Sequence, residues 1–399
     1  MTSKIDILPE FVCSVEKLIK NYMNDNNSIE NNNYKNDIKH DITNDNNDDD
    51  DNDNDDNDDD DDDDDDDNRG KLLSSKGPAS YFGDILDDPS IVWADDDEWL
   101  PRDLSTIINN NNNIKNDNNN LSNDVINRIK DALERIKLQG DVVPSFWKKK
   151  YEEKASQYWH NFYKRNMDRF YKDRHYLHIV FPELAPSSSS SSSSSLSNNS
   201  ISKSYTTRML EVGCGVGNAV VPLIEINPLL KVYAIDFAKS AIDTLLKHKY
   251  CQGNDPPIYA FQADIVKDNL DNIQEESLDI ILCLFVLSAI SPSDHAQVIY
   301  KLSRLLKPGG KLLIRDYGRF DEAQLRFKKG GKLDDNFYVR CDGTCSYFFE
   351  LQELVKICEN TNNLIEEEAK YILRQFANRQ KRQKRTRVWV HCKFIKKTN

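Results

Sequence analysis

The stretch RMLEVGCGVGNAVVPLIEI, residues 208–226, decides the fold. A short apolar run leads into Gly213, Gly215 and Gly217, and a helical pattern follows them. This order of strand, glycine turn and helix is typical of a loop that holds a nucleotide-like ligand, because glycine lets the backbone approach the ligand closely. Three spaced glycines alone are a weak signal, so the assignment depends on the residues that follow.

Acids close two of the next apolar runs. KVYAID ends at Asp236, and PIYAFQAD ends at Asp264. Because parallel strands bring their carboxyl ends to one edge, we expect Asp236 to accept hydrogen bonds from ribose hydroxyls and Asp264 to reach an adenine amine. A fourth run, LDIILCLFVLS, is apolar enough to be a central strand buried on both faces. A helical pattern then stops at Lys-Pro-Gly-Gly, 307–310, before a fifth strand, KLLIRDYG.

These features together resemble the seven-stranded S-adenosylmethionine-dependent methyltransferases. A dinucleotide-binding fold would favour glycine at position 218, where this chain has Asn218. The last two apolar runs, 364–376 and 387–394, are similar to the antiparallel pair that completes the sheet in that family. The resemblance implies an α/β, Rossmann-like class I methyltransferase fold with S-adenosyl-L-methionine as the cofactor.

The charge of the chain is divided unevenly. The 399 residues carry a net charge of −14, yet residues 1–70 hold 25 acids and 6 bases, and residues 71–399 hold 42 acids and 47 bases. The acidic average therefore does not exclude a polyanionic partner. The eight cysteines form no CxxC pair, and neither a run of 18 apolar residues nor a signal peptide is recognised. We expect a reduced cytoplasmic protein, with the nucleus as a further location, and no membrane span or disulfide framework.

Low-complexity tracts separate the segments that can fold. Ten aspartates from Asp58, nine serines from Ser187 and an asparagine run at 109–120 lack the apolar residues that a core needs. We interpret them as insertions tolerated in loops, and we expect a short amphipathic helix over 4–22. The predicted organisation is a mostly disordered, acidic and Asn-rich region (1–78), an N-terminal extension interrupted by an Asn-rich linker (79–144), a helical lid and RNA-binding segment (145–186), a Ser-rich linker (187–204), and a Rossmann-like methyltransferase domain (205–399) with an RNA-binding insertion (317–349).

Basic and aromatic residues are interleaved over 147–184. This composition suits RNA, because the bases neutralise phosphates while unstacked nucleobases find aromatic faces. Trp159 and Tyr163 are four residues apart and share one helical face. The alternative is an amphipathic helix that covers the sheet, with both rings in the core.

A series of blocks carries a closer resemblance. They are SQYWHNFYKRNMDRFYKDRHYLHIVFPELAP, LEVGCGVGN, LCLFVLSAI, RLLKPGG, RDYGRFDEAQLRFKKG and NFYVRCDGTCSYFF. Over 145–399, apart from the serine tract, the chain resembles the eukaryotic methyltransferase-like family that forms N3-methylcytidine in tRNA. FPELAP and the upstream YFGDILDDPSIVW are more similar to the threonine- and arginine-tRNA branch than to the serine-tRNA branch.

This resemblance implies methylation of cytidine 32 in the anticodon loop of threonine tRNAs, with arginine tRNAs as a further group. Two positions depart from the family pattern: Tyr176 stands for a tryptophan, and Cys345 stands for an arginine, which removes one positive charge. The resemblance also implies that Trp159 and Tyr163 cover the cofactor as an N-terminal lid. The implied cofactor contacts are Trp159, Tyr163, Gly213, Asp236, Asp264 and Leu284.

The predicted reaction asks for little acid–base chemistry. Cytosine N3 has an in-plane lone pair that can attack the sulfonium methyl group without prior deprotonation, and the product ring is cationic. Alignment and a nearby negative group therefore matter most. We predict that Asp316, which ends the fifth strand, stabilises this charge or holds the N4 amine; the alternative is a structural acid paired with Arg315. Arg174 and His175 are candidates for holding the flipped nucleotide or its phosphate, with a packing role as the alternative for His175.

A basic surface is expected beside this site. Residues from 370 onward contain eleven Lys and Arg and no acid. Arg382 and Arg385 belong to a segment, 379–387, that we expect to fill the loop between the last two strands and to contact phosphate; a solvated loop or a nuclear signal is the alternative. The insertion adds the candidates Arg326, Lys328, Lys329 and Arg340.

The sequence leaves other functions open. The alternatives among enzymes are methylation of serine tRNA or other RNA, or of a protein or small molecule; the alternative outside enzymes is a tRNA-binding adaptor without turnover. The expected partners are the anticodon arm of tRNA and, by resemblance, an aminoacyl-tRNA synthetase or an anticodon-binding adaptor protein. Cys341 and Cys345 lack a second ligand pair with suitable spacing, so we predict no metal.

Overall fold

The strands of the main sheet follow the order β1-β10-β11-β6-β5-β2-β3-β4. The computed structural model describes residues 92–94, 102–104, 107–108, 123–166, 171–186, 207–378 and 383–398, all within the unit Asp59–Asn399. The predicted helix over 4–22, the acidic region, the serine tract and Arg382 lie outside the described residues. The strands are β1 (Val92–Ala94), β2 (Thr207–Val212), β3 (Leu230–Asp236), β4 (Ile258–Gln262), β5 (Leu278–Leu284), β6 (Leu306–Tyr317), β10 (Leu364–Asn378) and β11 (Gln383–Lys396).

Seven of these strands confirm the predicted methyltransferase sheet. Strands β2 to β6 pair in parallel, and β11 lies antiparallel between β6 and β10. The short strand β1 extends the edge by pairing antiparallel with β10, with Trp93 opposite Arg374. The sequence did not predict β1, because its three residues lie in an aromatic and acidic stretch without a clear period.

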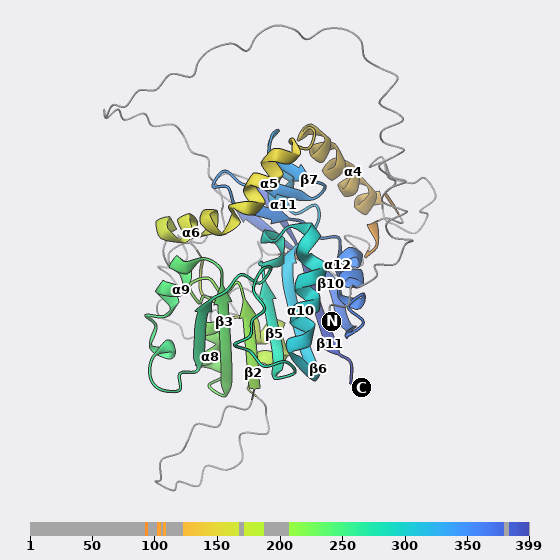
Figure 1. Cartoon of the computed structure of the whole chain (residues 1–399). Coiled ribbons are helices and arrows are strands. Elements are labelled where there is room, and N and C mark those ends of the chain that lie inside the picture. Colours follow the sequence, from red (N-terminus) through yellow and green to blue (C-terminus); the bar gives the residue numbers. More distant parts are fainter. Residues whose placement is uncertain are drawn as a thin grey trace, which may run out of the picture. The chain divides into compact units, whose positions relative to one another are not determined.

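Alternate residues of the central strands face two different layers of helices (Figure 1). Leu210 and Val212 pack in the cluster that contains α4, α10 and α12, whereas Met209 packs with α7, α8 and α9. This alternation is the two-residue period of a strand that is buried on both faces. The helices are α4 (Asn123–Leu138), α5 (Ser145–Glu153), α6 (Ala155–Asn166), α7 (Leu177–Val180), α8 (Val220–Ile226), α9 (Lys239–Leu245), α10 (His295–Leu305), α11 (Glu322–Leu325) and α12 (Leu351–Glu359). Among the described residues, no helix combines the length and the apolar character that crossing a bilayer requires.

The N-terminal helices and the insertion lie near the carboxyl ends of the strands. Helix α6 packs on α9 through Trp159, Phe162 and Tyr163 (Figure 1). The insertion contains α11 and a small antiparallel sheet of β7 (Lys332–Asp334), β8 (Phe337–Val339) and β9 (Cys345–Tyr347). Buried Asp321 holds it to β11, because its carboxylate accepts hydrogen bonds from Arg387 Nε at 3.0 Å and from the amide of Val388 at 2.6 Å.

Two predicted boundaries are wrong. The Lys-Pro-Gly-Gly segment does not precede the fifth strand but lies inside β6, where Leu306 pairs with Leu278 and Lys311 pairs with Ile280. The extra residues form an irregularity in the ladder, which a glycine-rich segment accommodates. The basic segment 379–387 is also not all loop, since β11 begins at Gln383. Arg385 therefore belongs to a strand and pairs with Phe376 across the ladder.

Gly310 tests the packing of this irregularity. A Cβ atom there would lie 2.9 Å from the carbonyl oxygen of Leu278 and 3.0 Å from that of Lys307. We expect Gly310→Ala to lower the free energy of unfolding by about 1–3 kcal/mol, because backbone atoms would have to move. Chemical denaturation of the purified protein measures this. At Gly331 an added Cβ meets its nearest neighbour at an ordinary 3.4 Å, so Gly331→Ala is the matched control, and equal losses in the two variants would contradict the packing argument.

Candidate active site

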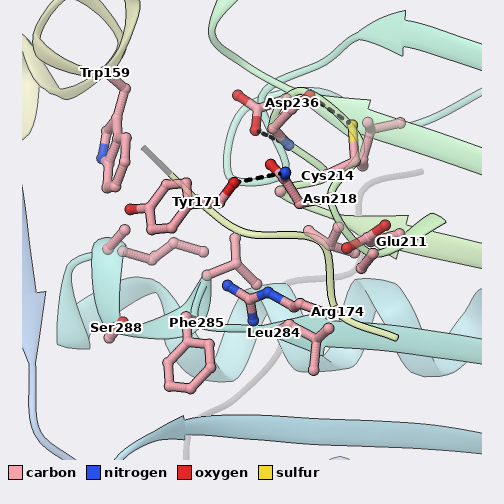
Figure 2. Close-up of a pocket in the computed structure, with 18 of the residues that line it drawn as sticks. Trp159, Tyr171, Arg174, Glu211, Cys214, Asn218, Asp236, Leu284, Phe285 and Ser288 are labelled. Carbon is pink, nitrogen blue, oxygen red and sulfur yellow. Dashed lines mark hydrogen bonds between the residues drawn. The ribbon is translucent and has the colours of Figure 1, made fainter. Parts of the chain in front are cut away.

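A cavity of about 300 Å³ lies at the carboxyl ends of β2, β3, β5 and β6 (Figure 2). This is the edge at which open parallel sheets bind their ligands. Its wall includes residues of helix α6, the segment 171–176, the glycine loop and the amino-terminal half of β11. The cavity thus brings together most of the residues that the sequence singled out.

The glycine loop shapes one end of the cavity. Gly213 and Gly215 line it, with positive φ values of 67° and 53°. A Cβ atom would lie 2.5 Å from a Val286 methyl group at Gly213 and 2.5 Å from the Tyr163 hydroxyl at Gly215. Gly217, at φ 100°, does not line the cavity; its neighbour is Leu245 of α9. Gly213 and Gly215 therefore let Val286 and Tyr163 pack against the backbone that lines the cavity, and Gly217 serves helix packing.

Asp236 connects the end of β3 to the glycine loop. Its carboxylate accepts hydrogen bonds from the amide of Gly215 at 2.9 Å and from the amide of Ala238 at 2.8 Å. Burial raises the pKa of Asp236 to about 6, although both amides favour the ionised form. Each carboxylate oxygen can accept a further bond, so the lining position agrees with a contact to ligand hydroxyls.

Asp264 lies on the wall two residues beyond β4. Its carboxylate accepts a hydrogen bond from the amide of Val266 at 3.0 Å and forms an ion pair with Lys267 at 2.9 Å. Lys301 of α10 braces this turn by donating to the carbonyl oxygens of Ile265 at 2.7 Å and Val266 at 3.1 Å. The turn is held from two sides, and Leu284 of β5 also lines the cavity.

Trp159 and Tyr163 of α6 both line the cavity and are both buried. Their ring centroids lie 6.1 Å apart, and burial raises the pKa of the Tyr163 hydroxyl above its usual range. The two interpretations of this helix therefore coincide, because the same face packs on α9 and closes the cavity. Figure 2 shows Trp159 and Tyr171 across the cavity from Asp236.

Glu211 of β2 is a site residue that the sequence reasoning missed. It lines the cavity, it is buried, and its Oε2 atom has no hydrogen-bond partner among the described residues. Burial raises the pKa of Glu211 to about 8; nearby Arg174 acts to lower this pKa and Asp236 to raise it. A buried carboxylate without a full set of partners favours a cationic ligand. The signal in the sequence was an acid inside an otherwise apolar strand.

The opposite end of the cavity is aromatic and basic. Phe285, directly after β5, has a positive φ of 53°, which is a strained conformation for a residue with a side chain. Its ring centroid lies 5.0 Å from that of Tyr317 and 5.8 Å from that of Trp389. Four arginines line this end of the cavity, and only Arg374 lies outside the residues and segments that the sequence singled out for contact with a substrate. They are Arg174, Arg340, Arg374 and Arg387.

The structure separates the three predicted catalytic residues. Arg174 lines the cavity, with its guanidinium carbon 5.1 Å from the centre of the Phe285 ring (Figure 2). His175, the next residue, is exposed and does not line the cavity. All four residues from Tyr171 to Arg174 line the cavity, whereas His175 begins the turn that follows them and faces solvent.

Asp316 is completely buried and does not line the cavity. Its carboxylate accepts hydrogen bonds from the amide of Ser288 at 3.0 Å and from the amide of Tyr317 at 2.8 Å. It is not paired with Arg315, because neighbouring strand residues face opposite sides of the sheet. Asp316 therefore lies behind the cavity wall in this structure, and its contact with a substrate stays a prediction. Its carboxylate positions the turn that carries Ser288 into the cavity wall.

The predicted RNA-binding residues fall into two groups. Arg340 lines the cavity and lies 5.8 Å from the Tyr317 ring, whereas Arg326, Lys328 and Lys329 are exposed on the insertion. Cys345 is buried in β9 and also lines the cavity, so the replaced arginine position faces the site. Among the described residues, no group of three or more His, Cys, Asp or Glu side chains is arranged to hold a metal ion.

Comparisons with known proteins agree with this site. A methyltransferase domain family matches residues 210–312. The tRNA N(3)-cytidine methyltransferase METTL2 of Xenopus tropicalis is 39% identical over 274 residues, which cover 62% of this chain and 79% of the relative. METTL6 of Homo sapiens, which has the same descriptive name, is 38% identical over 271 residues and covers 65% of this chain and 87% of the relative.

The chain belongs to the tRNA N(3)-cytidine methyltransferase family. METTL2 of Danio rerio is likewise 40% identical over 283 residues, covering 64% of this chain and 77% of the relative. A solved S-adenosylmethionine-dependent methyltransferase from Methanosarcina mazei is 15% identical, with a TM-score of 0.37 over 49% of this chain and 94% of that chain.

The cavity of this family member fits S-adenosylmethionine. The backbone of Gly213 and Gly215 lines the cavity without side chains, and Asp236 presents carboxylate oxygens beside it. The unsatisfied Oε2 atom of Glu211 matches a ligand that carries positive charge on its ammonium and sulfonium groups. The residues present therefore suit both halves of the cofactor, the ribose and the methionine part.

Glu211 makes cofactor binding depend on pH. Because its pKa lies near 8 in the free protein, the carboxyl is mostly protonated at pH 7, and a cationic ligand favours the ionised form. We expect the affinity for S-adenosylmethionine to rise between pH 7 and 8.5. Asp236, whose pKa lies near 6, is already ionised in that range. Glu211→Gln should flatten the rise and weaken binding roughly tenfold at pH 8.5.

Isothermal titration calorimetry in several buffers measures both effects, since the wild type should also release protons on binding at pH 7. S-adenosylhomocysteine, which lacks the sulfonium charge, serves as the matched ligand and should show a shallower rise. An unchanged slope in Glu211→Gln would contradict the assignment.

Proposed function

We propose that this chain transfers the methyl group of S-adenosylmethionine to N3 of cytidine 32 in the anticodon loop of tRNA, with threonine tRNAs and a further set of arginine tRNAs as substrates. The observation that carries the proposal is a single cavity with two chemically different ends. A glycine loop with Glu211 and Asp236 forms one end, and rings with arginines form the other. Family membership supports tRNA cytidine as the acceptor, and the resemblance of FPELAP and 81–93 supports the choice of tRNA.

The aromatic end suits an unstacked cytosine. Phe285, Tyr317 and Trp389 offer ring faces, and the guanidinium of Arg174 lies against the Phe285 ring. Base rings stack on such faces without sequence preference, and guanidinium groups donate to a pyrimidine carbonyl oxygen or to phosphate. Phe285 directly follows Leu284 of β5, and both residues line the cavity.

Charge moves during the reaction but is not created. The N3 lone pair forms the new bond to carbon while the electron pair of the sulfur–carbon bond returns to sulfur, so no proton leaves N3 and the positive charge passes to the pyrimidine ring. When bound, S-adenosylmethionine supplies the electrophilic methyl group. The chain has to hold the two partners in line and to stabilise a cation at both ends. Glu211 does so at the donor end, and the faces of Phe285 and Trp389 do so for the methylated ring.

Asp316 contributes to this alignment from behind the wall. Its hydrogen bond to the amide of Ser288 holds the 3₁₀ turn Leu287–Ala289, and Ser288 and Ala289 both line the cavity. Burial raises the pKa of Asp316 to about 6, while the bonds that it accepts favour its ionised form. We infer that it is a positioning residue, and that no general base is required.

The proposed function predicts N3-methylcytidine as the product. Purified protein, labelled S-adenosylmethionine and total tRNA are incubated, and the nucleosides are separated by mass spectrometry. The label should appear in N3-methylcytidine and should disappear when cytidine 32 of the tRNA is replaced by uridine. Threonine, arginine and serine tRNA transcripts, compared at equal concentration, then rank the substrates.

Four other results would change the proposal. Label in a different nucleoside would overturn the reaction, and label that survives the cytidine 32 change would overturn the position. No product with pure protein, together with N3-methylcytidine after addition of a synthetase or anticodon-binding adaptor, would show that such a partner is required. A serine tRNA that is preferred over threonine tRNA would overturn the proposed branch.

A further inference from the structure

Helix α5 carries aromatic side chains that its fold leaves in solvent. None of its residues, Ser145 to Glu153, is buried. Phe146 is 67% exposed and Trp147 is 41% exposed, which is unusual for rings of this size. Isolated exposed apolar residues need no explanation, but two adjacent ones in a helix without a buried face do.

These rings form a continuous series that ends at the cavity. We call the residues Phe146, Trp147, Tyr151 and Tyr158 the aromatic ladder. Its successive ring centroids lie 5.5, 6.3 and 5.7 Å apart, and Trp147 and Tyr151 are stacked. The last ring, Tyr158, packs directly on Gly343, where a Cβ atom would lie 2.3 Å from it.

Gly343 belongs to the turn between two cavity residues. Arg340 precedes it and Cys345 follows it, and both line the cavity. The ladder therefore leads from the solvent-exposed tip of α5 to the wall of the cavity that holds the basic and aromatic end.

Positive charge flanks the ladder on both sides. The Lys150 Nζ atom lies 4.5 Å from the centre of the Trp147 ring. The segment 140–143 lies beside the insertion, because the amide of Val143 donates to the carbonyl oxygen of Lys332 at 2.8 Å and Gly140 adjoins the side chain of Lys329. Lys148 pairs with Asp334 at 2.5 Å and Lys149 with Glu153 at 3.8 Å. Within the part of the chain that the structure describes, Lys150, Lys328 and Lys329 form no ion pair.

We propose that the aromatic ladder binds unpaired loop nucleotides of the RNA substrate that neighbour the methylated cytidine, with Trp147 as the main stacking ring. This inference rests on the proposed function and adds a second recognition site to it. Exposed rings that alternate with lysines match single-stranded RNA, in which bases stack and phosphates need positive charge. A protein partner would instead favour an apolar patch with few lysines at its centre.

The position of the ladder also explains how a loop could be held open. A base that enters the cavity leaves its neighbours without one stacking partner, and a ring outside the cavity can replace that partner. Because the ladder contacts Gly343, in the turn between the cavity residues Arg340 and Cys345, neighbouring nucleotides can stay close to the flipped base. Recognition of this kind depends on unpaired bases rather than on the sequence of the stem.

A double-mutant cycle between protein and RNA tests the proposal. Binding of full-length tRNA to the wild type and to Trp147→Ala is measured, with S-adenosylhomocysteine present, for an intact tRNA and for tRNAs with one abasic loop position each. Trp147→Ala should weaken binding of the intact tRNA roughly tenfold. At one or two loop positions beside the target cytidine, removal of the base should also weaken tRNA binding to the wild type roughly tenfold. At those same positions, removal of the base should weaken tRNA binding to Trp147→Ala hardly any further.

Two variants serve as controls. Tyr259→Ala removes a ring of similar exposure, 44%, that also lies under a lysine, with the Lys231 Nζ atom 4.7 Å from its centre, but on strand β4 away from the ladder. It should bind tRNA like the wild type. Trp147→Phe keeps an aromatic face and should restore most of the affinity. Cofactor affinity, measured alongside, should be unchanged in all variants.

The outcomes separate this inference from the proposed function. If the wild type forms no N3-methylcytidine even after addition of a synthetase or anticodon-binding adaptor, the proposed function fails. If the wild type methylates tRNA but Trp147→Ala binds every tRNA as tightly as the wild type does, only the ladder fails as an RNA site, and a protein occupant takes its place. An equal loss for intact and abasic RNAs at all positions would also overturn it, because a structural effect of Trp147 does not depend on one base.

Discussion

The buried carboxylate of Asp236 is the interaction on which the rest of the site depends. It joins the amide of Gly215 to the amide of Ala238, and so it fixes the glycine loop against the end of β3. The loop must be held in this way because Gly213 and Gly215 adopt positive φ values and let Val286 and Tyr163 pack directly against the backbone. With the loop in place, the lid rings of α6 close over it, and the cavity acquires an end that is shaped for a nucleoside.

Residues of opposite charge line the two ends of the cavity. Glu211 and Asp236 gather at the glycine loop, and arginines gather around Phe285 and Tyr317. A cationic methyl donor suits the first environment, and a polyanionic RNA suits the second. Because the reaction carries positive charge from donor to acceptor, the acidic end and the aromatic faces stabilise the same charge at successive moments. Methyl transfer by this mechanism requires no metal and no strong base. Buried Asp316 then has a structural role in aligning the two substrates.

Much of the fold and of the donor end followed from the sequence, for identifiable reasons. Glycine spacing, strand-end acids and an apolar central strand are local signals, so Gly213, Asp236, Asp264 and Leu284 could be predicted to meet at one edge. The acceptor end is assembled from β6, β11 and the insertion, which are distant in the chain, and the pattern did not reveal that Arg374, Arg387 and Trp389 face it. Asp316 lies behind the cavity wall and His175 is exposed, and position in the chain alone does not say on which side of the wall a side chain lies. The Lys-Pro-Gly-Gly segment was predicted to end a helix before the fifth strand, but it lies inside β6. The same residue types can end a helix or form an irregularity in a strand.

The central claim is that Phe285 receives the acceptor base while the donor end works independently of it. Single-turnover methyl transfer to tRNA by Phe285→Leu, together with its affinity for S-adenosylmethionine, tests this most directly. The account predicts that the rate falls by roughly tenfold or more, because one ring face is lost, while cofactor affinity stays within about twofold of the wild type. An unchanged rate would contradict the claim, and so would an equal loss of cofactor binding, because Phe285 would then belong to the donor end.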